Sequence, residues 1–313
     1  MRRVDQPRGE PIRRKLGIAA LVVVLLAAAV YARPLSFLFL YRDVVLWIRG
    51  VESRTVEAGG HRIHMLSQGE GEALVILPGL LSTAHDASPL LDAFARRRRA
   101  IAVDLLGQGR SSRPDIAYSI SDQSNAVIAV LDQARLGPVD LLGVSMGGWI
   151  ALDVAAKRPD LVRRLILAGS AGLRFETDLT PEFFAPQDVV ALNRLVERQS
   201  ARPARLPAFL ARDSVRRLRA NEWVTLRAAR SMITWREAYD RRLGVVHAPT
   251  LVYWGREDRI IPLEAGRRLA AGIAGARLVV GDGCGHLAVL ECRDHFVGAV
   301  EAFLAAPRRD QRN

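Results

Sequence analysis

The chain of 313 residues is poor in the residue types that build small disulfide or metal scaffolds. It has two cysteines, Cys284 and Cys292, which are too few for a disulfide framework or a cysteine-based zinc site. We expect them to be two unrelated small residues, although an oxidising compartment would allow them to pair. The sequence therefore predicts a fold held by its apolar core, for which half of its residues are available.

Lysine is scarce as well, because Lys15 and Lys157 are the only two, so arginine carries nearly all of the formal net charge of +12. A basic chain can be attracted to an anionic membrane surface or to nucleic acid. The sequence contains no motif of a DNA- or RNA-binding module, and basic charge alone is weak evidence for one. We therefore expect no nucleic-acid partner.

Charged residues are absent from one stretch near the N-terminus, residues 16–32. A helix of this length covers about 25 Å, which is the short end of a membrane span. We predict a basic cytoplasmic tail over residues 1–15, a transmembrane anchor over 16–32 and an interfacial linker over 33–50. Because arginines crowd the N-terminal side, the catalytic body is expected on the outer or periplasmic side. The alternative is a signal peptide cleaved after Ala32 and a secreted protein.

The rest of the chain alternates short apolar runs with helical patterns. Gly59 and Gly60 indicate the turn of a hairpin, and six later runs have the pattern of buried strands. Apolar strands that alternate with helices are typical of a mostly parallel sheet covered on both faces. The predicted strands are 73–77, 100–107, 139–144, 162–169, 250–254 and 276–280, and the predicted helices are 121–135, 146–158, 263–273 and 292–305.

One interval has no strand pattern, residues 170–246, and its helical stretches are broken by prolines. Such an interval is too long for a plain connection in a compact domain. We therefore predict that it forms a separate helical layer over the sheet. The predicted units are an α/β core over residues 51–169 and 247–305, a helical cap over 170–246 and a C-terminal tail over 306–313.

Ser145 lies in the pentapeptide Gly143-Val144-Ser145-Met146-Gly147, which has the pattern G-x-S-x-G. The motif follows a predicted strand and precedes a predicted helix, where a sharp turn would lift the serine above the sheet. Glycines two residues before and after allow the strand and the helix to approach each other. The pattern predicts that Ser145 is a nucleophile.

A serine hydroxyl needs a base, and elimination among the six histidines favours His286. His286 follows the last predicted strand on a glycine-rich loop. Four of the others belong to the front hairpin, to the opposite end of the sheet or to a helix pattern. The remaining one, His85, could line the pocket. Asp258 follows the fifth predicted strand and would orient the imidazole, with Glu257 as the less favoured acid. The chain order of these residues is nucleophile, acid, base.

The tetrahedral intermediate of such a reaction needs two hydrogen-bond donors for its oxyanion. One is expected from the backbone of Met146, the residue after the nucleophile. The other is expected from the backbone of Leu80, in the loop after the first buried strand. This mechanism needs neither a metal nor an organic cofactor, and we predict none.

These residues together resemble the α/β-hydrolase superfamily from about residue 51 to residue 304. The stretch DLLGQGRSS is similar to the superfamily's D-x-x-G-x-G-x-S loop. The stretches GVSMGG, AGSAGLRFETD and VVGDGCGHLAVLE, behind an apolar N-terminal segment, resemble the membrane-anchored monoacylglycerol lipases. The resemblance implies the α/β-hydrolase fold, a mostly parallel sheet flanked by helices, with a helical cap insertion and an N-terminal membrane-anchor helix.

The predicted cap would supply the substrate pocket. Between residues 176 and 242, thirteen arginines and nine acids are interleaved with apolar residues, so the apolar side would line an acyl pocket while arginines meet lipid headgroups. We expect a serine carboxylic ester hydrolase that acts on monoacylglycerol-like lipid esters and contacts the membrane through its N-terminal helix. The expected pocket residues are His85, Phe183, Phe184, Trp223 and Trp235.

Three alternatives stay open at this point. Carbon–carbon bond hydrolases and cofactor-free haloperoxidases share the implied fold and keep the serine. A catalytically silent member that binds a hydrophobic ligand or a partner at the membrane would keep the fold without the chemistry. Haloalkane dehalogenases are disfavoured because they use an aspartate nucleophile where this chain has Ser145.

Overall fold

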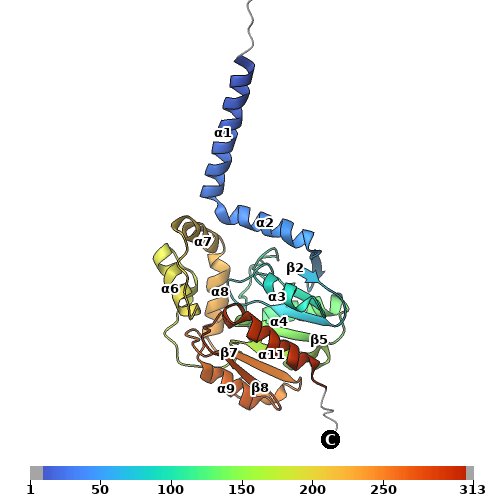
Figure 1. Cartoon of the computed structure of the whole chain (residues 1–313). Helices are drawn as coiled ribbons and strands as arrows, with labels where there is room; N and C mark the ends of the chain where they lie inside the picture. Colours follow the sequence, from blue (N-terminus) through green and yellow to red (C-terminus); the bar gives the residue numbers. More distant parts are fainter. Residues whose placement is uncertain (1–9, 308–313) are drawn as a thin grey trace, which may run out of the picture.

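The computed structural model describes residues 10–307, and its centre is one eight-stranded sheet (Figure 1). The strand order is β1-β2-β4-β3-β5-β6-β7-β8; β2 pairs antiparallel with β1 and β4, and every other pairing is parallel. The strands are β1 (Glu52–Ala58), β2 (His61–Gln68), β3 (Ala73–Leu77), β4 (Arg99–Val103), β5 (Val139–Val144), β6 (Val162–Ala168), β7 (Thr250–Gly255) and β8 (Arg277–Gly281). The predicted mostly parallel sheet is confirmed.

Helices cover both faces of the sheet. They are α3 (Ser88–Phe94), α4 (Ile120–Gln133), α5 (Met146–Lys157), α9 (Leu263–Gly272), α10 (Ala288–Glu291) and α11 (Arg293–Ala305), with a short 3₁₀ turn η1 (Pro159–Leu161) before β6. Successive strand residues point to opposite faces, so in β5 Leu141 packs with α4, α5 and α9, whereas Leu142 packs with α3 and α11. Two apolar clusters, one on each face, therefore fix the sheet between its helices.

The strand and helix patterns of the sequence agree with the structure to within a few residues at most ends. The clearest difference is at β4, which ends at Val103 although the apolar run continues to Leu106. Leu105 and Leu106 are buried in the loop instead, where the backbone amide of Leu106 is held by the side chain of Gln123. The seven residues of α3 are too few for a clear helical period, and the sequence did not predict this helix.

The interval between β6 and β7 is helical. It contains η2 (Pro181–Phe184), α6 (Val189–Gln199), α7 (Ala208–Ala220), α8 (Glu222–Ile233) and η3 (Leu243–Val245). We refer to residues 170–246 as the cap. Glu237 binds the cap to the core, because its carboxylate accepts hydrogen bonds from the first amides of α4, at Ile120 and Ser121, each 2.9 Å long.

The N-terminal segment differs from its prediction. It forms α1 (Glu10–Ala32), which projects from the body, and α2 (Pro34–Ile48), which lies across the body (Figure 1). Pro34 begins α2 without cost, because the first turn of a helix needs no amide from that position. The expected linker is thus a helix, and most of the expected basic tail and C-terminal tail, residues 1–9 and 308–313, lies outside the described residues.

The predicted transmembrane anchor over residues 16–32 is not supported. Among the helices of residues 10–307, none is by itself long and apolar enough to cross a membrane. The stretches Leu21–Ala32 and Pro34–Ile48 satisfy the criterion only as a pair, and the chain bends by 96° between them.

A buried polar cluster joins α2 to the sheet. Asp104, just after β4, is fully buried and accepts hydrogen bonds from His64 on β2 (2.7 Å) and from the amide of Ala84 (2.7 Å). His85 stacks on His64 and binds Asp43 of α2 at 2.6 Å. Burial alone would raise the pKa of Asp104, but the hydrogen bonds from His64 and from backbone amides lower it, so the carboxylate is charged.

We expect Asp104→Ala to lower the free energy of unfolding by about 3 kcal/mol, because it leaves buried donors without an acceptor. Urea unfolding followed by circular dichroism measures this loss. A lowered native pKa stabilises the fold above the unfolded value, about 3.9, so the difference from wild type should shrink as the pH falls below about 4. The exposed Asp115→Ala is the matched control, and equal effects of both variants at pH 7 would contradict this role of Asp104.

Candidate active site

Ser145 lies at the junction of β5 and α5. Its backbone angles, φ 56° and ψ −119°, are ones that residues other than glycine rarely adopt. Its amide donates to the carbonyl of Ala168 on β6, and its carbonyl accepts from the amides of Gly148 and Ala171, each at 3.0 Å. These bonds hold the strained turn in place. The hydroxyl therefore projects from a fixed point at the carboxyl end of the central strand.

Close backbone contacts explain the glycines around the serine. A Cβ atom at Gly143 would overlap the carbonyl of Gly147, and a Cβ atom at Gly147 would overlap the carbonyl of Leu77 on β3. The loop after β3 also approaches closely, since a Cβ atom at Gly79 would lie 3.1 Å from Cβ of Ser145. Substitution at Gly143 or Gly147 would push α5 away from the sheet and move the hydroxyl with it.

The structure brings the three predicted triad residues into one chain of hydrogen bonds. His286 Nε2 lies 2.9 Å from Ser145 Oγ, and His286 Nδ1 lies 2.8 Å from Asp258 Oδ2. The other carboxylate oxygen of Asp258 accepts from the amides of Ile260 and Ile261, both at 2.9 Å. An imidazole that carries its proton on Nδ1, facing Asp258, leaves Nε2 free to accept the serine proton.

Glu291 fixes the loop that carries His286. Its carboxylate accepts hydrogen bonds from the amides of Gly285 (2.6 Å) and Ala201 (3.0 Å) and from the hydroxyl of Ser200. Burial alone would raise the pKa of Glu291, but these bonds lower it below its usual range. The carboxylate is therefore charged at neutral pH and links the loop to the cap. We did not predict a role for Glu291 from the sequence. The one feature that could have indicated it is a carboxylate close behind His286, in a short helical stretch.

Cys284 and Cys292 are bonded to each other, with Cα atoms 6.0 Å apart. The expectation of two unrelated cysteines is therefore wrong. The sequence spacing of eight residues gave no sign that the chain turns back between β8 and α11 and brings the two sulfurs together. The bridge closes a loop that contains His286, and this restricts the positions that the imidazole can reach.

Leu80 and Met146, the residues expected to supply the oxyanion donors, both lie next to the serine. Met146 is the first residue of α5, and Leu80 lies in the loop that packs against Ser145 through Gly79. Within residues 10–307, neither amide donates a hydrogen bond to a protein acceptor. Both remain available to an oxyanion formed at Ser145, and the amide at the N-terminus of α5 adds the positive end of the helix dipole.

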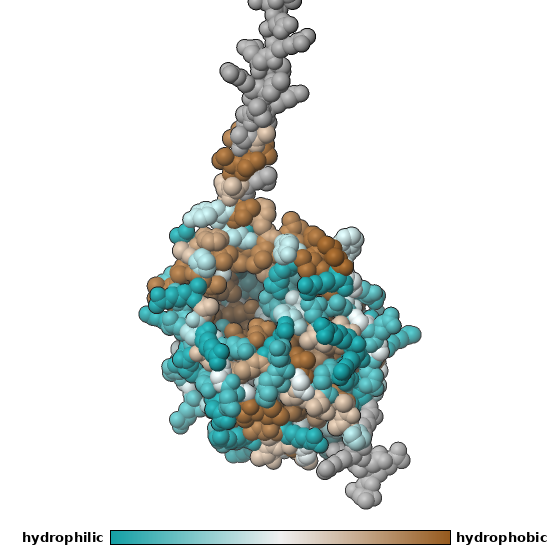
Figure 2. Space-filling view, in the orientation of Figure 1, coloured by the Kyte–Doolittle hydropathy of each residue, from teal (hydrophilic) through white to brown (hydrophobic). Residues whose placement is uncertain are grey.

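Two cavities meet at the serine. The first lies under the cap and is lined mainly by apolar residues, among them Ala229, Met232 and Trp235. The second extends past His286, and its lining includes the polar residues Ser82 and Gln199. Ser145, Leu80 and Phe184 line both cavities. A space-filling view shows a hollow with hydrophobic walls in the body below α2 (Figure 2).

Two of the five predicted pocket residues, Phe184 and Trp235, line these cavities, and three do not. Phe183 packs against the core cluster and edge-on to Phe184, and Trp223 packs edge-on against Tyr118. The predicted place of these two in the pocket is corrected, because Phe183 packs against the core cluster and Trp223, which is 39% exposed, packs on Tyr118 outside both cavities.

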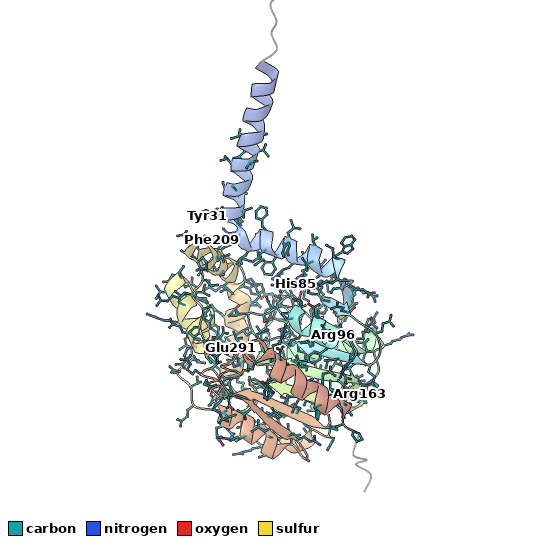
Figure 3. All side chains as sticks on the ribbon, viewed as in Figure 1. Tyr31, His85, Arg96, Arg163, Phe209 and Glu291 are labelled. Carbon is teal, nitrogen blue, oxygen red and sulfur yellow. A yellow bond between two sulfur atoms is a disulfide. The ribbon has the colours of Figure 1, made fainter. Side chains whose placement is uncertain are left out.

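His85 is also placed differently from its prediction. It lies below α2 (Figure 3), where it stacks on His64 and binds Asp43. The loop that carries it does follow β3 at the active-site edge, as expected, and its neighbour Asp86 lines the second cavity. The imidazole points to the other side of this loop because α2, which the sequence did not predict, covers that side.

Residues 72–291 match the alpha/beta hydrolase fold family, and the chain belongs to this family. It is 34% identical over 281 residues to a 2-hydroxymuconate semialdehyde hydrolase of Pseudomonas putida, covering 80% of this chain and 94% of that protein. It is 31% identical over 278 residues to a 2-hydroxy-6-oxo-2,4-heptadienoate hydrolase of Pseudomonas putida, covering 81% and 96%. Together with the fold, these relatives define the chain as a hydrolase.

Solved structures show the same fold. A membrane phospholipase A superposes with a TM-score of 0.79 at 24% identity, covering 93% of this chain and 98% of that one. A meta-cleavage product hydrolase from Pseudomonas fluorescens superposes with a TM-score of 0.73 at 23% identity, covering 80% and 97%. At these identities the likeness concerns the fold alone.

The comparisons correct the expected reaction. We predicted a carboxylic ester hydrolase of monoacylglycerol-like lipids, but the relatives above are named for dienoate and semialdehyde substrates, which contain no ester bond. The expected resemblance to monoacylglycerol lipases is likewise not confirmed. The error arose because the serine motif and its loops are shared by the whole family and do not specify which bond is attacked.

We expect Asp258→Asn to slow covalent inactivation by a fluorophosphonate by roughly 10³- to 10⁴-fold, because the amide no longer stabilises the imidazolium. The second-order rate constant of inactivation measures the reactivity of the serine without a substrate. Asp282→Asn, an exposed carboxylate paired with Arg256, is the control and should leave the rate constant unchanged. An unchanged rate constant in Asp258→Asn would exclude Asp258 as the third member of the triad.

Proposed function

We propose that the protein hydrolyses the carbon–carbon bond next to the 6-oxo carbonyl, a ketone or an aldehyde, of a 2-hydroxy-6-oxo-dienoate or a related vinylogous dicarbonyl compound. A hydrolase of such a compound must break a carbon–carbon bond, because the compound has no ester or amide. The relatives at 34% and 31% identity are named for substrates of this class. The catalytic roles given below to Ser145, His286 and Asp258 are part of this proposal.

The meeting of two cavities at Ser145 is the observation that supports this proposal best. The 6-oxo carbon of such a substrate has two arms, the conjugated dienoate and a terminal group. Ser82 and Gln199 line the second cavity and would donate hydrogen bonds to the polar dienoate arm. Asp86 belongs to the same lining, and Arg42 pairs with its carboxylate at 3.5 Å. The first cavity, under the cap, offers an apolar surface for the terminal group. The carbonyl carbon between the arms would then lie at the serine.

The site contains the groups that the reaction needs. After the 2-hydroxy dienoate has tautomerised to the 2,6-dioxo form, Ser145 Oγ attacks the 6-oxo carbon and His286 takes its proton. The amides of Leu80 and Met146 stabilise the alkoxide. When the alkoxide collapses, the bond between carbons 5 and 6 breaks, its electron pair passes to the conjugated arm, and the imidazolium of His286 protonates that arm. Water, activated by His286, then releases the acid from Ser145.

We expect the wild-type protein to convert 2-hydroxy-6-oxo-2,4-heptadienoate into acetate and 2-hydroxypenta-2,4-dienoate in equal amounts, measured by liquid chromatography. Ser145→Ala should lower kcat by at least about 10³-fold, because the nucleophile is lost. Ser214→Ala on α7, whose hydroxyl donates to the carbonyl of Leu210, is the control and should be unchanged. Absence of acetate with the wild-type protein, or its undiminished release by Ser145→Ala, would contradict the proposal.

Ala229→Leu is expected to change substrate preference, because it fills part of the apolar cavity from α8. For a substrate with a phenyl terminal group, kcat/KM should fall roughly tenfold, and for the methyl substrate it should stay within about threefold. Steady-state kinetics on both substrates measure the ratio. Ala220→Leu, at the exposed end of α7, is the matched control. An equal loss for both substrates would show that the terminal group does not occupy this cavity.

A further inference from the structure

One face of α2 presents large apolar side chains to the exterior without cover from any described residue. Trp47 is 77% exposed and Ile48 is 70% exposed. Single exposed apolar residues are common on protein surfaces, but a contiguous group of them marks an interaction site. We call the exposed large apolar side chains of this helix the α2 face; they are Leu38, Leu40, Tyr41, Val44, Trp47 and Ile48. Figure 2 shows hydrophobic residues gathered at this end of the body.

The opposite side of α2 is firmly attached to the body. On the core side, Asp43 binds His85 at 2.6 Å, and Arg49 binds Asp92 at 2.5 Å. On the cap side, the amide of Leu35 donates to Asp213 of α7 at 2.8 Å. The α2 face is therefore not the outer side of a detached helix, because the contacts below it fix its direction relative to both core and cap.

The helix before α2 continues the apolar surface in a second direction. The exposed large side chains of α1 include Leu21–Leu25 and Tyr31, and α1 meets α2 at 96°. Tyr31 stacks on Phe209 of α7, with ring centroids 5.6 Å apart, so the corner between the two helices is also attached (Figure 3). A flat apolar phase can cover both helices at once, if α2 lies along its surface and the end of α1 points into it.

Charge at the edges of α2 favours an anionic surface. Arg33 precedes the helix and is exposed, and Arg49, which follows it, keeps about half of its side chain exposed beside its partner Asp92. Arg217 of α7 is exposed beside the helix, where its guanidinium lies 4.3 Å from the ring centroid of Phe39. Tryptophan and tyrosine side chains are enriched at the headgroup level of a bilayer, and arginines are attracted to anionic headgroups. The two kinds of residue lie side by side here, as binding to an anionic bilayer requires.

We propose that the α2 face is a docking surface for an anionic lipid bilayer, with α2 parallel to the bilayer plane and Trp47 at the headgroup level. The proposal requires no helix that spans the membrane. It also places the body at a fixed orientation, because α2 is attached both to α7 of the cap and to the loop before α3. The bilayer would lie on the side of the molecule from which α1 projects (Figure 1).

Flotation of the full chain with vesicles tests this proposal. We expect binding to vesicles of phosphatidylcholine mixed with phosphatidylglycerol, and weaker binding to phosphatidylcholine alone. Trp47→Glu and Ile48→Glu should each lower the bound fraction at least about tenfold, because a carboxylate cannot enter the apolar layer. Val245→Glu is the matched control, since Val245 is exposed on η3, away from α2, and this variant should float as the wild type does.

Quenching by brominated lipids provides a second measurement. The chain has five tryptophans, of which Trp149 and Trp254 are buried and Trp223 is 39% exposed on α8. The contribution of Trp47 is therefore the difference between the wild type and Trp47→Phe, which should still bind and should lose most of the quenching. The proposal is overturned if the wild type does not float, if Trp47→Glu floats as well as the wild type, or if Val245→Glu loses binding equally. It is also overturned if Trp47→Glu only converts a dimer into a monomer in light scattering, because the α2 face would then cover a second copy of the chain.

Discussion

The backbone of Ser145 is the constraint on which the site depends. A residue with a side chain is held at φ 56° because the amide and carbonyl groups of the turn are bonded to β6 and to the start of α5. Gly143 and Gly147 allow the strand, the helix and β3 to approach within contact distance. Because the turn is fixed by the sheet and not by the cap, the hydroxyl keeps its position whatever occupies the cavities.

Two loops from the same edge of the sheet complete the arrangement, and each is anchored separately. The loop after β7 holds Asp258 through the amides of Ile260 and Ile261. The loop after β8 holds His286 between a disulfide bridge and the carboxylate of Glu291. The same carboxylate binds the amide of Ala201, so the position of the imidazole is coupled to the end of α6 in the cap. A movement of the cap during substrate entry would therefore also shift the imidazole of His286.

Six of the strands and their order along the chain could be predicted because each is a short apolar run bounded by turn residues, whereas β1 and β2 were indicated by the turn at Gly59 and Gly60. The proximity of Ser145, His286 and Asp258 followed from placing each after a strand of one parallel sheet. The docking of α2 could not be predicted, since its attachment depends on Asp43 meeting His85, which is 42 residues away. The same helix explains why His85 is not in the pocket. The reaction could not be read from the serine motif, because that motif fixes a nucleophile and leaves the substrate to cavities built from distant segments.

Mapping of a fluorophosphonate adduct by mass spectrometry tests most directly whether Ser145 is the nucleophile that His286 activates. Tryptic cleavage after Arg135 and Lys157 releases residues 136–157, a peptide in which Ser145 is the only serine. We predict that the adduct mass appears on this peptide in the wild-type protein and is absent from His286→Ala under the same conditions. An adduct on another peptide, or an equal yield of adduct on this peptide in His286→Ala, would contradict the account.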